Sequence, residues 1–197
     1  MARAGRLAPG TMAAVLGLDD EAVERVCAEV STQDAPVVAA NYNSPGQVVI
    51  SGAVASVERA CERLKEAGAK RCLPLNVSGA FHSPLMREAA EAMSQALRQT
   101  EFRLGAFSVV SNVLAQPVED PADWHDLLTR QLAEPVRWTA SVTAMNKAGA
   151  KLFVEFGAGS VLCGLVRRVM ADAEALAVES PETLEEFCDR LAVVGRG

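Results

Sequence analysis

The chain has 197 residues, 50% of them hydrophobic, with a formal net charge of −6 and a pI near 5.0. This length and apolar content fit one ordinary domain or two small ones with a substantial core, and they exclude extensive disorder away from the ends. An acidic chain without a basic block is a poor match for nucleic acid or an anionic membrane, and no apolar run is long enough to span a bilayer.

The N-terminal part of the chain alternates short apolar runs with helical patterns. Residues 1–10, rich in Gly, Pro and Arg, are interpreted as a loop. Strands are predicted at 11–17, 35–43, 48–52 and 70–77, and helices at 18–30 and 53–68. Asp19 or Asp20 can cap the first helix, and Gly68 can end the second. This β-α-β-β-α-β order predicts a split β-α-β, ferredoxin-like subdomain over residues 11–77.

From residue 78 onward, strand and helix patterns alternate, which is typical of α/β architecture with parallel strands. Helices are predicted from Ser83 to about Gln99 and at 120–133, 136–149, 160–172 and 181–194, and strands at 107–113, 150–157 and 175–180. The strand at 150–157 is so apolar that we expect a sheet covered on both faces. Because three strands make a thin sheet with an uncovered edge, residues 78–197 are expected to be part of something larger.

His82, one of the two histidines, lies in the run SGAFHSPLM (78–86), at a junction between a strand and a helix. Ser83 and Pro84 suit the N-cap and the first position of that helix. The positive end of a helix dipole disfavours a protonated imidazole, so this position favours a neutral histidine that can act as a base. A junction histidine that only binds the local backbone is equally consistent with the position.

A histidine base needs a nucleophile within hydrogen-bond reach, and the sequence contains no GxSxG elbow. The closest run is GAGSVLCG (157–164), whose glycines suit a tight strand-to-helix turn with Ser160 near the N-cap and Cys163 in the core. The same glycines can bring backbone N–H groups toward an anion, which is the weaker interpretation. The other histidine, His125, is predicted to lie on a solvated helix face.

Two further stretches are dense in polar groups. In NYNSPGQVVISG (41–52), the side chains of Asn41, Asn43 and Gln47 exceed what a Pro-Gly turn requires, so some of them are expected to face a cleft. In TRQLAEPVRW (129–138), Gln131 lies near a helix end cut short by Pro135. The free main-chain carbonyls of such an end are available to hold a histidine ring.

The cysteines are odd in number and are never spaced as CxxC; they are Cys27, Cys61, Cys72, Cys163 and Cys188. With two histidines far apart in the sequence, we expect no metal site. Free thiols in a reducing compartment are the simplest interpretation, and the N-terminal stretch lacks the apolar core of a signal peptide. The sequence therefore predicts a cytoplasmic protein.

Five stretches in a fixed order carry a family resemblance: NYNSPGQVVISG, LPLNVSGAFHSPLM, SNV, RQLAEPVRWTASV and FVEFGAGSVLCGLVRR. They resemble the malonyl-CoA:acyl-carrier-protein transacylases of fatty acid synthesis and the related acyltransferase domains of polyketide synthases. The resemblance covers about residues 11–180. It implies a ferredoxin-like subdomain inserted into an α/β-hydrolase-like acyltransferase domain, of which residues 78–197 are the C-terminal part.

The resemblance implies transfer of malonyl from coenzyme A to the phosphopantetheine thiol of acyl carrier protein through a serine–histidine, ping-pong mechanism. His82 is then the general base, and the main-chain carbonyl of Gln131 orients its ring. Phe81 implies selectivity for malonyl, because its bulk opposes a branched α-carbon. Asn43 and Gln47 resemble the loop beside the pocket. No cofactor is implied apart from the coenzyme A thioester substrate and the carrier's phosphopantetheine.

The sequence departs from the family in one respect that bears on activity. The family's GHSxGE nucleophile motif, its oxyanion-hole glutamine and its malonyl-pairing arginine are not found in these 197 residues, and Arg3 and Arg6 do not match that arginine's spacing. We therefore expect a C-terminal portion that is inactive alone, with the missing segment in a longer parent or a partner. The alternatives are a non-catalytic short homologue that binds acyl carrier protein or a complementing chain, and a hydrolase using Ser160 or Cys163.

Overall fold

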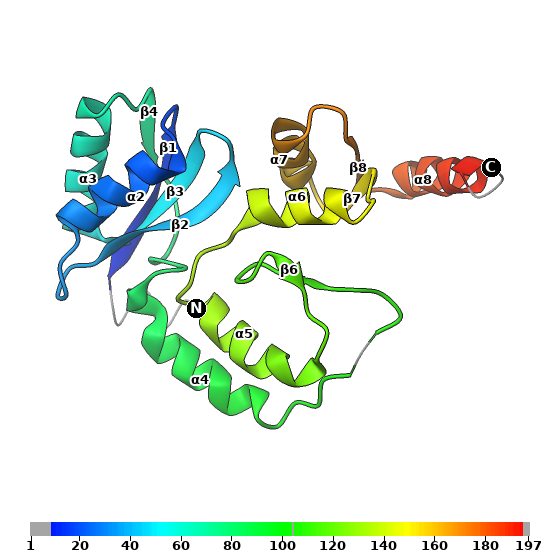
Figure 1. Ribbon diagram of the computed structural model, residues 1–197, viewed down its shortest axis with the longest axis horizontal. Coiled ribbons are helices and arrows are strands. Elements are labelled where there is room, and N and C mark those ends of the chain that lie inside the picture. The colour runs from blue at the N-terminus through cyan, green and yellow to red at the C-terminus, as the bar shows by residue number, and fades with distance from the viewer. Residues whose placement is uncertain (1–8, 104, 195–197) are drawn as a thin grey trace. The chain divides into compact units, whose positions relative to one another are not determined.

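The computed structural model describes residues 9–103 and 105–194 (Figure 1). Most of the predicted N-terminal loop, with Arg3 and Arg6, therefore lies outside the described residues. The chain divides into two compact units, Met1–Ser141 and Val142–Gly197. The predicted boundary between residues 11–77 and 78–197 falls inside the first of these units, so it does not coincide with the division at residue 141. It stays a prediction.

The first unit contains a four-stranded antiparallel sheet with two helices on one of its faces (Figure 1). The strands are β1 (Gly10–Leu16), β2 (Val37–Ser44), β3 (Gln47–Ala53) and β4 (Arg71–Pro74), in the spatial order β2-β3-β1-β4. The helices are α2 (Asp20–Val30) and α3 (Val54–Glu66). The chain order β-α-β-β-α-β is the one predicted from the sequence.

Local signals in the sequence explain where these helices begin and end. The carboxylate of Asp19 accepts a hydrogen bond of 2.7 Å from the Ala22 N–H and caps α2. After α3, Gly68 adopts a φ of +105° that favours glycine, so the chain can turn back toward β4. The apolar faces of both helices meet one face of the sheet in a core that includes Val23, Val26, Cys27, Val57, Ala60 and Leu64 from the helices and Val15, Val37, Val48 and Ile50 from the strands.

The rest of the first unit is mainly helical. A 3₁₀ turn (η1, Pro84–Met86) leads into α4 (Arg87–Leu97), and a second 3₁₀ turn (η2, Pro121–Asp123) leads into α5 (Trp124–Gln131). The helix predicted directly after Ser83 thus starts with a 3₁₀ turn.

The prediction that His125, on α5, lies on a solvated helix face is wrong, because its side chain is half-buried. Its Nε2 lies 2.6 Å from the Leu97 carbonyl, and its ring packs edge-on against Phe102, which joins α5 to the end of α4.

The strand predicted at 107–113 is wrong for most of its length. Only β5 (Val110–Ser111) is extended, and it pairs antiparallel with β6 (Gln116–Pro117). The chain folds back between them because Val113 and Val118 pack on Leu127 of α5, and the Ala115 N–H donates to the Ser111 carbonyl. Phe107, at the start of the predicted strand, is 77% exposed.

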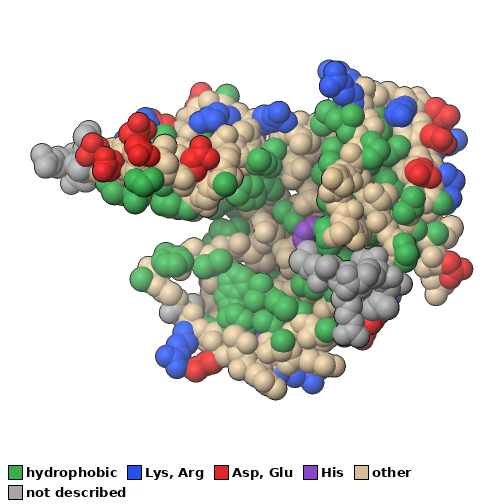
Figure 2. Space-filling model, turned by 180° about the vertical axis from the view of Figure 1, so that it is seen from behind, with side chains coloured by type: hydrophobic (Ala, Val, Ile, Leu, Met, Phe, Trp, Pro, Cys, Tyr) green, Lys and Arg blue, Asp and Glu red, His purple; other side chains and the backbone are tan. Residues whose placement is uncertain are grey.

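Hydrophobic side chains also gather on the surface of the part of this unit formed by α4, α5 and the β5–β6 hairpin (Figure 2). Phe107, Val109 and Leu114 are among its exposed apolar residues. Surfaces of this kind are typical of regions that another polypeptide covers. Among the described residues, no helix has the length and apolar character needed to cross a membrane.

The second unit is a small α/β layer. Its strands β7 (Leu152–Phe156) and β8 (Glu174–Val178) are parallel, as predicted, and α7 (Val161–Val169) and α8 (Pro181–Val194) pack beside them. Helix α6 (Trp138–Lys147) runs across the division between the units. The expectation that β7 is covered on both faces is wrong for the described residues, since the strand is only half-buried and Phe156 is 64% exposed.

Candidate active site

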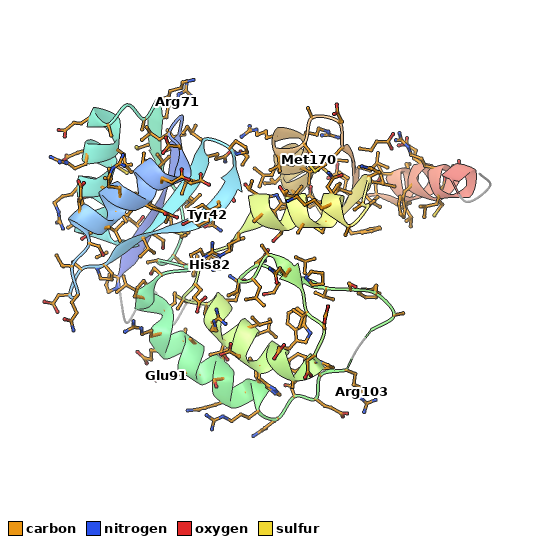
Figure 3. The ribbon with its side chains drawn as sticks, in the orientation of Figure 1. Tyr42, Arg71, His82, Glu91, Arg103 and Met170 are labelled. Atoms are coloured by element: carbon orange, nitrogen blue, oxygen red, sulfur yellow. The ribbon has the colours of Figure 1, made fainter. Side chains whose placement is uncertain are left out.

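His82, labelled in Figure 3, is held by two consecutive main-chain carbonyls, those of Gln131 at the end of α5 and of Leu132 directly after it. Its N–H donates to the Leu132 carbonyl at 3.1 Å, and its Nδ1 lies 2.8 Å from the Gln131 carbonyl oxygen. Because a carbonyl only accepts hydrogen bonds, this contact requires the proton on Nδ1. In a neutral ring, this placement of the proton leaves the lone pair on Nε2, and that is the form that a general base requires.

The backbone of His82 is in the left-handed region, with φ +57°. This conformation is uncommon for a residue with a side chain and persists where surrounding contacts hold it. The next residue, Ser83, is fully buried; its hydroxyl donates to the Ala80 carbonyl at 2.7 Å and accepts from the Leu85 N–H at 3.3 Å. Ser83 therefore caps η1, as predicted.

The stretch from Gln131 to Thr139 joins the site to the rest of the first unit. Val136 pairs with β2, where its N–H donates to the Ala40 carbonyl and its own carbonyl accepts from the Tyr42 N–H. The Arg137 N–H donates to the Asn112 carbonyl at 3.0 Å, and the Thr139 hydroxyl donates to the Tyr42 carbonyl at 3.0 Å. Sequence stretches that stand far apart in the chain, NYN, FH, SNV and RQL, are thus brought together by backbone hydrogen bonds.

The face of the sheet opposite the two helices carries Phe81, which packs against Met12, Ala40 and Val49. Residues paired across antiparallel strands point to the same face. Asn41 pairs with Val49 and therefore lies on the Phe81 face. Gln47 lies on that face too, because it alternates with Val48, which belongs to the core under the helices.

The predicted pocket residues Asn43 and Gln47 are less closely tied to the histidine. Asn43 lies at a register shift of β2, between the pairs formed by Tyr42 and Ser44. Within the described part of the chain, the hydrogen-bond partners of His82 come from Gln131 and Leu132, not from these two side chains. The structure thus brings His82 and Gln131 together, with Phe81 next to His82 in the chain, whereas Asn43 and Gln47 lie beside the turn between β2 and β3.

The GAGS turn has its backbone N–H groups engaged by the chain's own carboxylates. The Cys163 N–H, in the first turn of α7, donates to Glu155 at 2.9 Å, and the Gly159 N–H donates to Glu179 at 2.8 Å. Hydrogen bonds from that helix start, the largest of them from Cys163, hold the pKa of Glu155 below its usual value. The weaker interpretation, a site for an external anion, is therefore not favoured.

Neither candidate nucleophile of this turn is arranged for attack. Ser160 stands at the N-cap of α7 but is exposed, and its side chain makes no capping hydrogen bond. Cys163 is buried, as predicted, and burial followed by the charge and hydrogen bond of Glu155 raises the pKa of its thiol. A thiol with a raised pKa is a poor source of thiolate.

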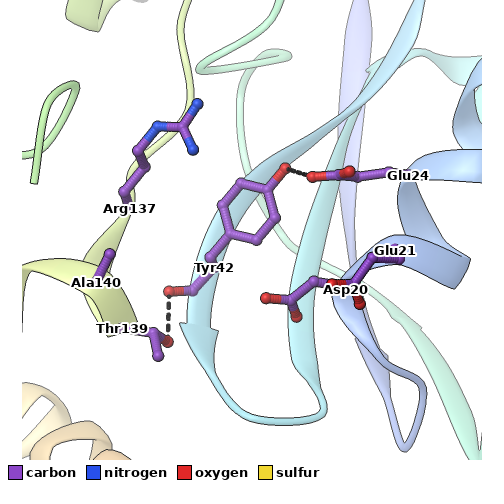
Figure 4. Close-up of a pocket in the computed structure, with 7 residues that line it drawn as sticks. All are labelled: Asp20, Glu21, Glu24, Tyr42, Arg137, Thr139 and Ala140. Atoms are coloured by element: carbon purple, nitrogen blue, oxygen red, sulfur yellow. Dashed lines mark hydrogen bonds between the residues drawn. The ribbon is translucent and has the colours of Figure 1, made fainter. Parts of the chain in front are cut away.

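A pocket of about 280 Å³ lies beside Tyr42, lined by Asp20, Glu21, Glu24, Tyr42, Arg137, Thr139 and Ala140 (Figure 4). The Tyr42 hydroxyl donates to Glu24. Burial and then this carboxylate raise the pKa of Tyr42, and burial together with Glu21 and Glu24 raises the pKa of Asp20. Tyr42 pairs with Val48 and so lies on the helix-covered face, opposite Phe81. This pocket was not predicted from the sequence, where the signal for it was a tyrosine between two asparagines.

Metal ligands are not gathered anywhere in the described ranges, since no group of three or more His, Cys, Asp or Glu side chains is placed to hold an ion. All five cysteines are free. The imidazole of His82 and the carbonyls that bind it are thus a candidate site built without a metal ligand set among the described residues.

Comparisons of the sequence and of the structure with known proteins all identify acyl transferases. The model of the acyl transferase domain family matches residues 2–184. The malonyl CoA-acyl carrier protein transacylase of Bacillus subtilis (strain 168) is 44% identical over 176 residues, which are 89% of this chain and 56% of that protein. A solved acyl-carrier-protein S-malonyltransferase from Burkholderia pseudomallei is 44% identical, with a TM-score of 0.86 over 90% of this chain and 57% of its own.

A second solved structure is a malonyl-transacylase in complex with its type II PKS acyl-carrier protein. It is 42% identical, with a TM-score of 0.85, and the match covers 89% of this chain and 56% of that one. The chain therefore spans somewhat under three-fifths of the length of these relatives.

Proposed function

The chain belongs to the acyl transferase domain family, and from that premise we propose that it supplies the histidine base of a malonyl-CoA:acyl-carrier-protein transacylase. The observation that carries the proposal is the 2.8 Å contact between His82 Nδ1 and the Gln131 carbonyl, which leaves Nε2 as the free, basic nitrogen of the ring. The names of the relatives support malonyl-CoA and acyl carrier protein as its substrates.

In the proposed mechanism, His82 Nε2 takes the proton of a serine hydroxyl while the serine oxygen attacks the carbonyl of malonyl-CoA. The tetrahedral intermediate collapses, the C–S bond breaks, and the imidazolium returns its proton to the departing coenzyme A thiol. In the second half-reaction, Nε2 takes the proton of the carrier's phosphopantetheine thiol, which attacks the malonyl-serine ester. The proton then passes to the serine oxygen, and the enzyme is regenerated. No cofactor takes part in this proposal.

The serine is not provided by the 197 residues, which contain no GHSxGE or GxSxG motif. We propose that it comes, with the oxyanion donor and the arginine for the malonyl carboxylate, from further polypeptide in a parent chain or a partner. The exposed apolar side chains of the β5–β6 region support such a covering segment. On this proposal the isolated chain binds no malonyl covalently, because most of the rate enhancement comes from the missing groups.

The other predicted residues and the predicted subdomains have proposed roles as well. We propose that Phe81 limits the acyl group to malonyl, that Asn43 and Gln47 line the outer part of the pocket, and that the protein works in the cytoplasm. Residues 11–77 would be the ferredoxin-like subdomain and residues 78–197 the C-terminal part of the acyltransferase core. The antiparallel order β2-β3-β1-β4 supports the first assignment, and the parallel pair β7–β8 supports the second.

The experiment is acylation by labelled malonyl-CoA, with stable label on protein as the readout. The 197-residue chain alone should take no label, whereas a chimaera that adds the unmatched remainder of the Bacillus subtilis relative should be labelled and discharged by acyl carrier protein. In the chimaera, His82→Ala should slow acylation by about 10²- to 10⁴-fold. Stable label on the chain alone, or full activity of the His82→Ala chimaera, would contradict the proposal.

Two control variants separate the alternative nucleophiles from this mechanism. Ser160→Ala and Cys163→Ala should leave the labelling rate of the chimaera within about threefold of the parent, because neither side chain is arranged for attack. Loss of labelling in either variant would favour the hydrolase alternative.

A further inference from the structure

The two carbonyls that fix His82 belong to a short segment at the end of α5 that is closed by a side-chain bridge. Helical carbonyls in a last turn have no partner within the helix, so those of Gln131 and Leu132 are available to the histidine. Their direction depends on how the chain leaves the helix. Whatever fixes the backbone from Arg130 to Glu134 therefore also fixes the imidazole.

The bridge is a two-pronged ion pair between the residues on either side of these carbonyls. Arg130 Nε donates to Glu134 Oε1 at 2.8 Å, and Arg130 Nη2 donates to Glu134 Oε2 at 3.0 Å. A two-pronged arginine–carboxylate pair restricts orientation as well as distance. On the backbone side, the Ala133 and Glu134 N–H groups both donate to the Arg130 carbonyl, which closes the same segment from within.

The exposure of this ion pair limits its contribution to the stability of the fold. The side chains of Arg130 and Glu134 are 38% and 40% exposed. Ion pairs with this degree of solvent contact contribute little to global stability. An exposed pair of this strength still changes the population of one local backbone arrangement by about two- to fivefold, which is the scale on which a neighbouring ring can be reoriented.

We infer that Glu134, acting through Arg130, is a positioning residue for His82. It holds the Gln131 carbonyl in the direction that selects the Nδ1–H form of the ring, and the Leu132 carbonyl where it accepts the His82 backbone N–H. This inference rests on the proposed function, in which the free Nε2 of that form is the base. Glu134 itself does not contact His82; its effect passes through the backbone of the segment that it closes.

The test is the tautomeric state of the His82 ring, measured by long-range ¹H–¹⁵N correlation spectra of the full 197-residue chain at a pH where imidazoles are neutral. The sequence has two histidines, so His82→Ala assigns both rings. Wild-type His82 should carry its proton on Nδ1. Glu134→Gln keeps the shape but loses the charged fork, and Arg130→Lys keeps the charge but cannot form two prongs; each should raise the share of the Nε2–H form by about threefold.

Asp126→Asn is the matched control. Asp126 pairs with Arg130 Nη1 at 3.1 Å, but both residues lie within α5, so this contact does not cross the two carbonyls. The control should leave the His82 signals unchanged, and all variants should keep a melting temperature close to that of the wild type, because the pair is exposed.

The possible outcomes separate the two proposals. Wild-type ring signals in both Glu134→Gln and Arg130→Lys would overturn the positioning role while leaving His82 as the proposed base. An equal shift in Asp126→Asn would overturn it too, since any loss of charge on Arg130's partners would then suffice. A wild-type ring with its proton on Nε2 would overturn the proposed function and this inference with it.

Discussion

The Nδ1 atom of His82 lies 2.8 Å from the main-chain carbonyl oxygen of Gln131, 49 residues further along the chain. The contact uses the backbone of Gln131 rather than its amide side chain, whose Nε2 stands 3.4 Å from the same nitrogen. The carbonyl is the closer partner and requires a proton on Nδ1, so the amide does not donate there. The identity of residue 131 therefore matters less than the path of the chain through it.

This distinction predicts unequal effects of two substitutions in an active chimaera. Gln131→Ala keeps the carbonyl and should lower the rate of malonyl transfer by less than about tenfold, whereas His82→Ala removes the base and should lower it by about 10²- to 10⁴-fold. The measurement is the single-turnover rate of serine acylation. Equal losses in the two variants would mean that the amide side chain, not the carbonyl, holds the ring.

Phe81 is predicted to limit the size of the acyl group, and its ring also packs against the sheet. Phe81→Ser opens space beside His82 and should raise the ratio of methylmalonyl to malonyl transfer by about tenfold, a typical value for one methyl group in a pocket. The same change removes contacts with Met12, Ala40 and Val49 and should reduce the free energy of unfolding by about 2 kcal/mol, since the ring is only half-buried.

The matched control for that change is Phe81→Leu, which keeps an apolar, bulky side chain on the sheet. It should retain most of the stability and the preference for malonyl. Competition between the two acyl-CoA substrates measures the ratio, and thermal unfolding measures the stability. If Phe81→Ser changed stability without changing the ratio, Phe81 would be a packing residue only.

Tyr42 is the single tyrosine of the chain, so its ionisation can be followed directly by ultraviolet absorbance. Burial, followed by the hydrogen bond to Glu24, raises its pKa above the ordinary value of 10.0, because a phenolate there would be poorly solvated and beside a carboxylate. Tyrosinate absorbance should therefore stay low through pH 10 in the folded chain. An ordinary titration midpoint in the folded protein would contradict the geometry of this pocket.

Two glutamate variants test the causes of that shift. Glu24→Gln removes the charged acceptor and should lower the Tyr42 pKa, but the value should remain above 10.0 because burial is the larger cause. Glu21→Gln, on the same helix and lining the same pocket, should have a smaller effect, since Glu21 does not bind the hydroxyl.

Sequence patterns predicted the features that depend on near neighbours in the chain. The order of strands and helices up to residue 77, the capping role of Asp19 and the end of α3 near Gly68 all follow from periodicity, capping and glycine conformation. The helix end before Pro135 predicted free carbonyls near Gln131 that can hold a histidine ring. The pairing of His82 with the Gln131 carbonyl was predicted from the family resemblance, because no local pattern relates residues so far apart in the chain.

Features that depend on distant contacts were not predicted. The run at 107–113 has the β-branched content of a strand, yet Val113 packs on Leu127 and the chain turns back. His125 looks solvated by its charged neighbours, although the end of α4 offers it the Leu97 carbonyl. The Arg130–Glu134 fork and the pairing of Val136 with β2 likewise arise only when the segments meet.

Glu155 provides a prediction in the second unit, where its carboxylate accepts the Cys163 N–H at the start of α7. A negative charge at a helix N-terminus is stabilised by the free N–H groups and the helix dipole. The pKa of Glu155 is consequently lower in the folded chain than its ordinary value of 4.5. The resulting stability is present above pH 4.5 and is lost as the pH falls through the folded-state pKa.

Glu155→Gln should therefore weaken α7 at neutral pH, and the difference from the wild type should shrink as the pH falls below 4.5, where the wild-type carboxylate becomes protonated as well. Hydrogen exchange of the Cys163 amide, with thermal unfolding alongside it, measures this over the acid range. Glu185→Gln, which removes an exposed charge from α8 in the same unit, is the control and should not change the protection of that amide. A Glu155→Gln effect that stays constant from neutral to acid pH would show that the side chain acts by shape rather than by charge. A contribution from the charge has to disappear when the carboxylate is protonated, whereas a contribution from shape does not.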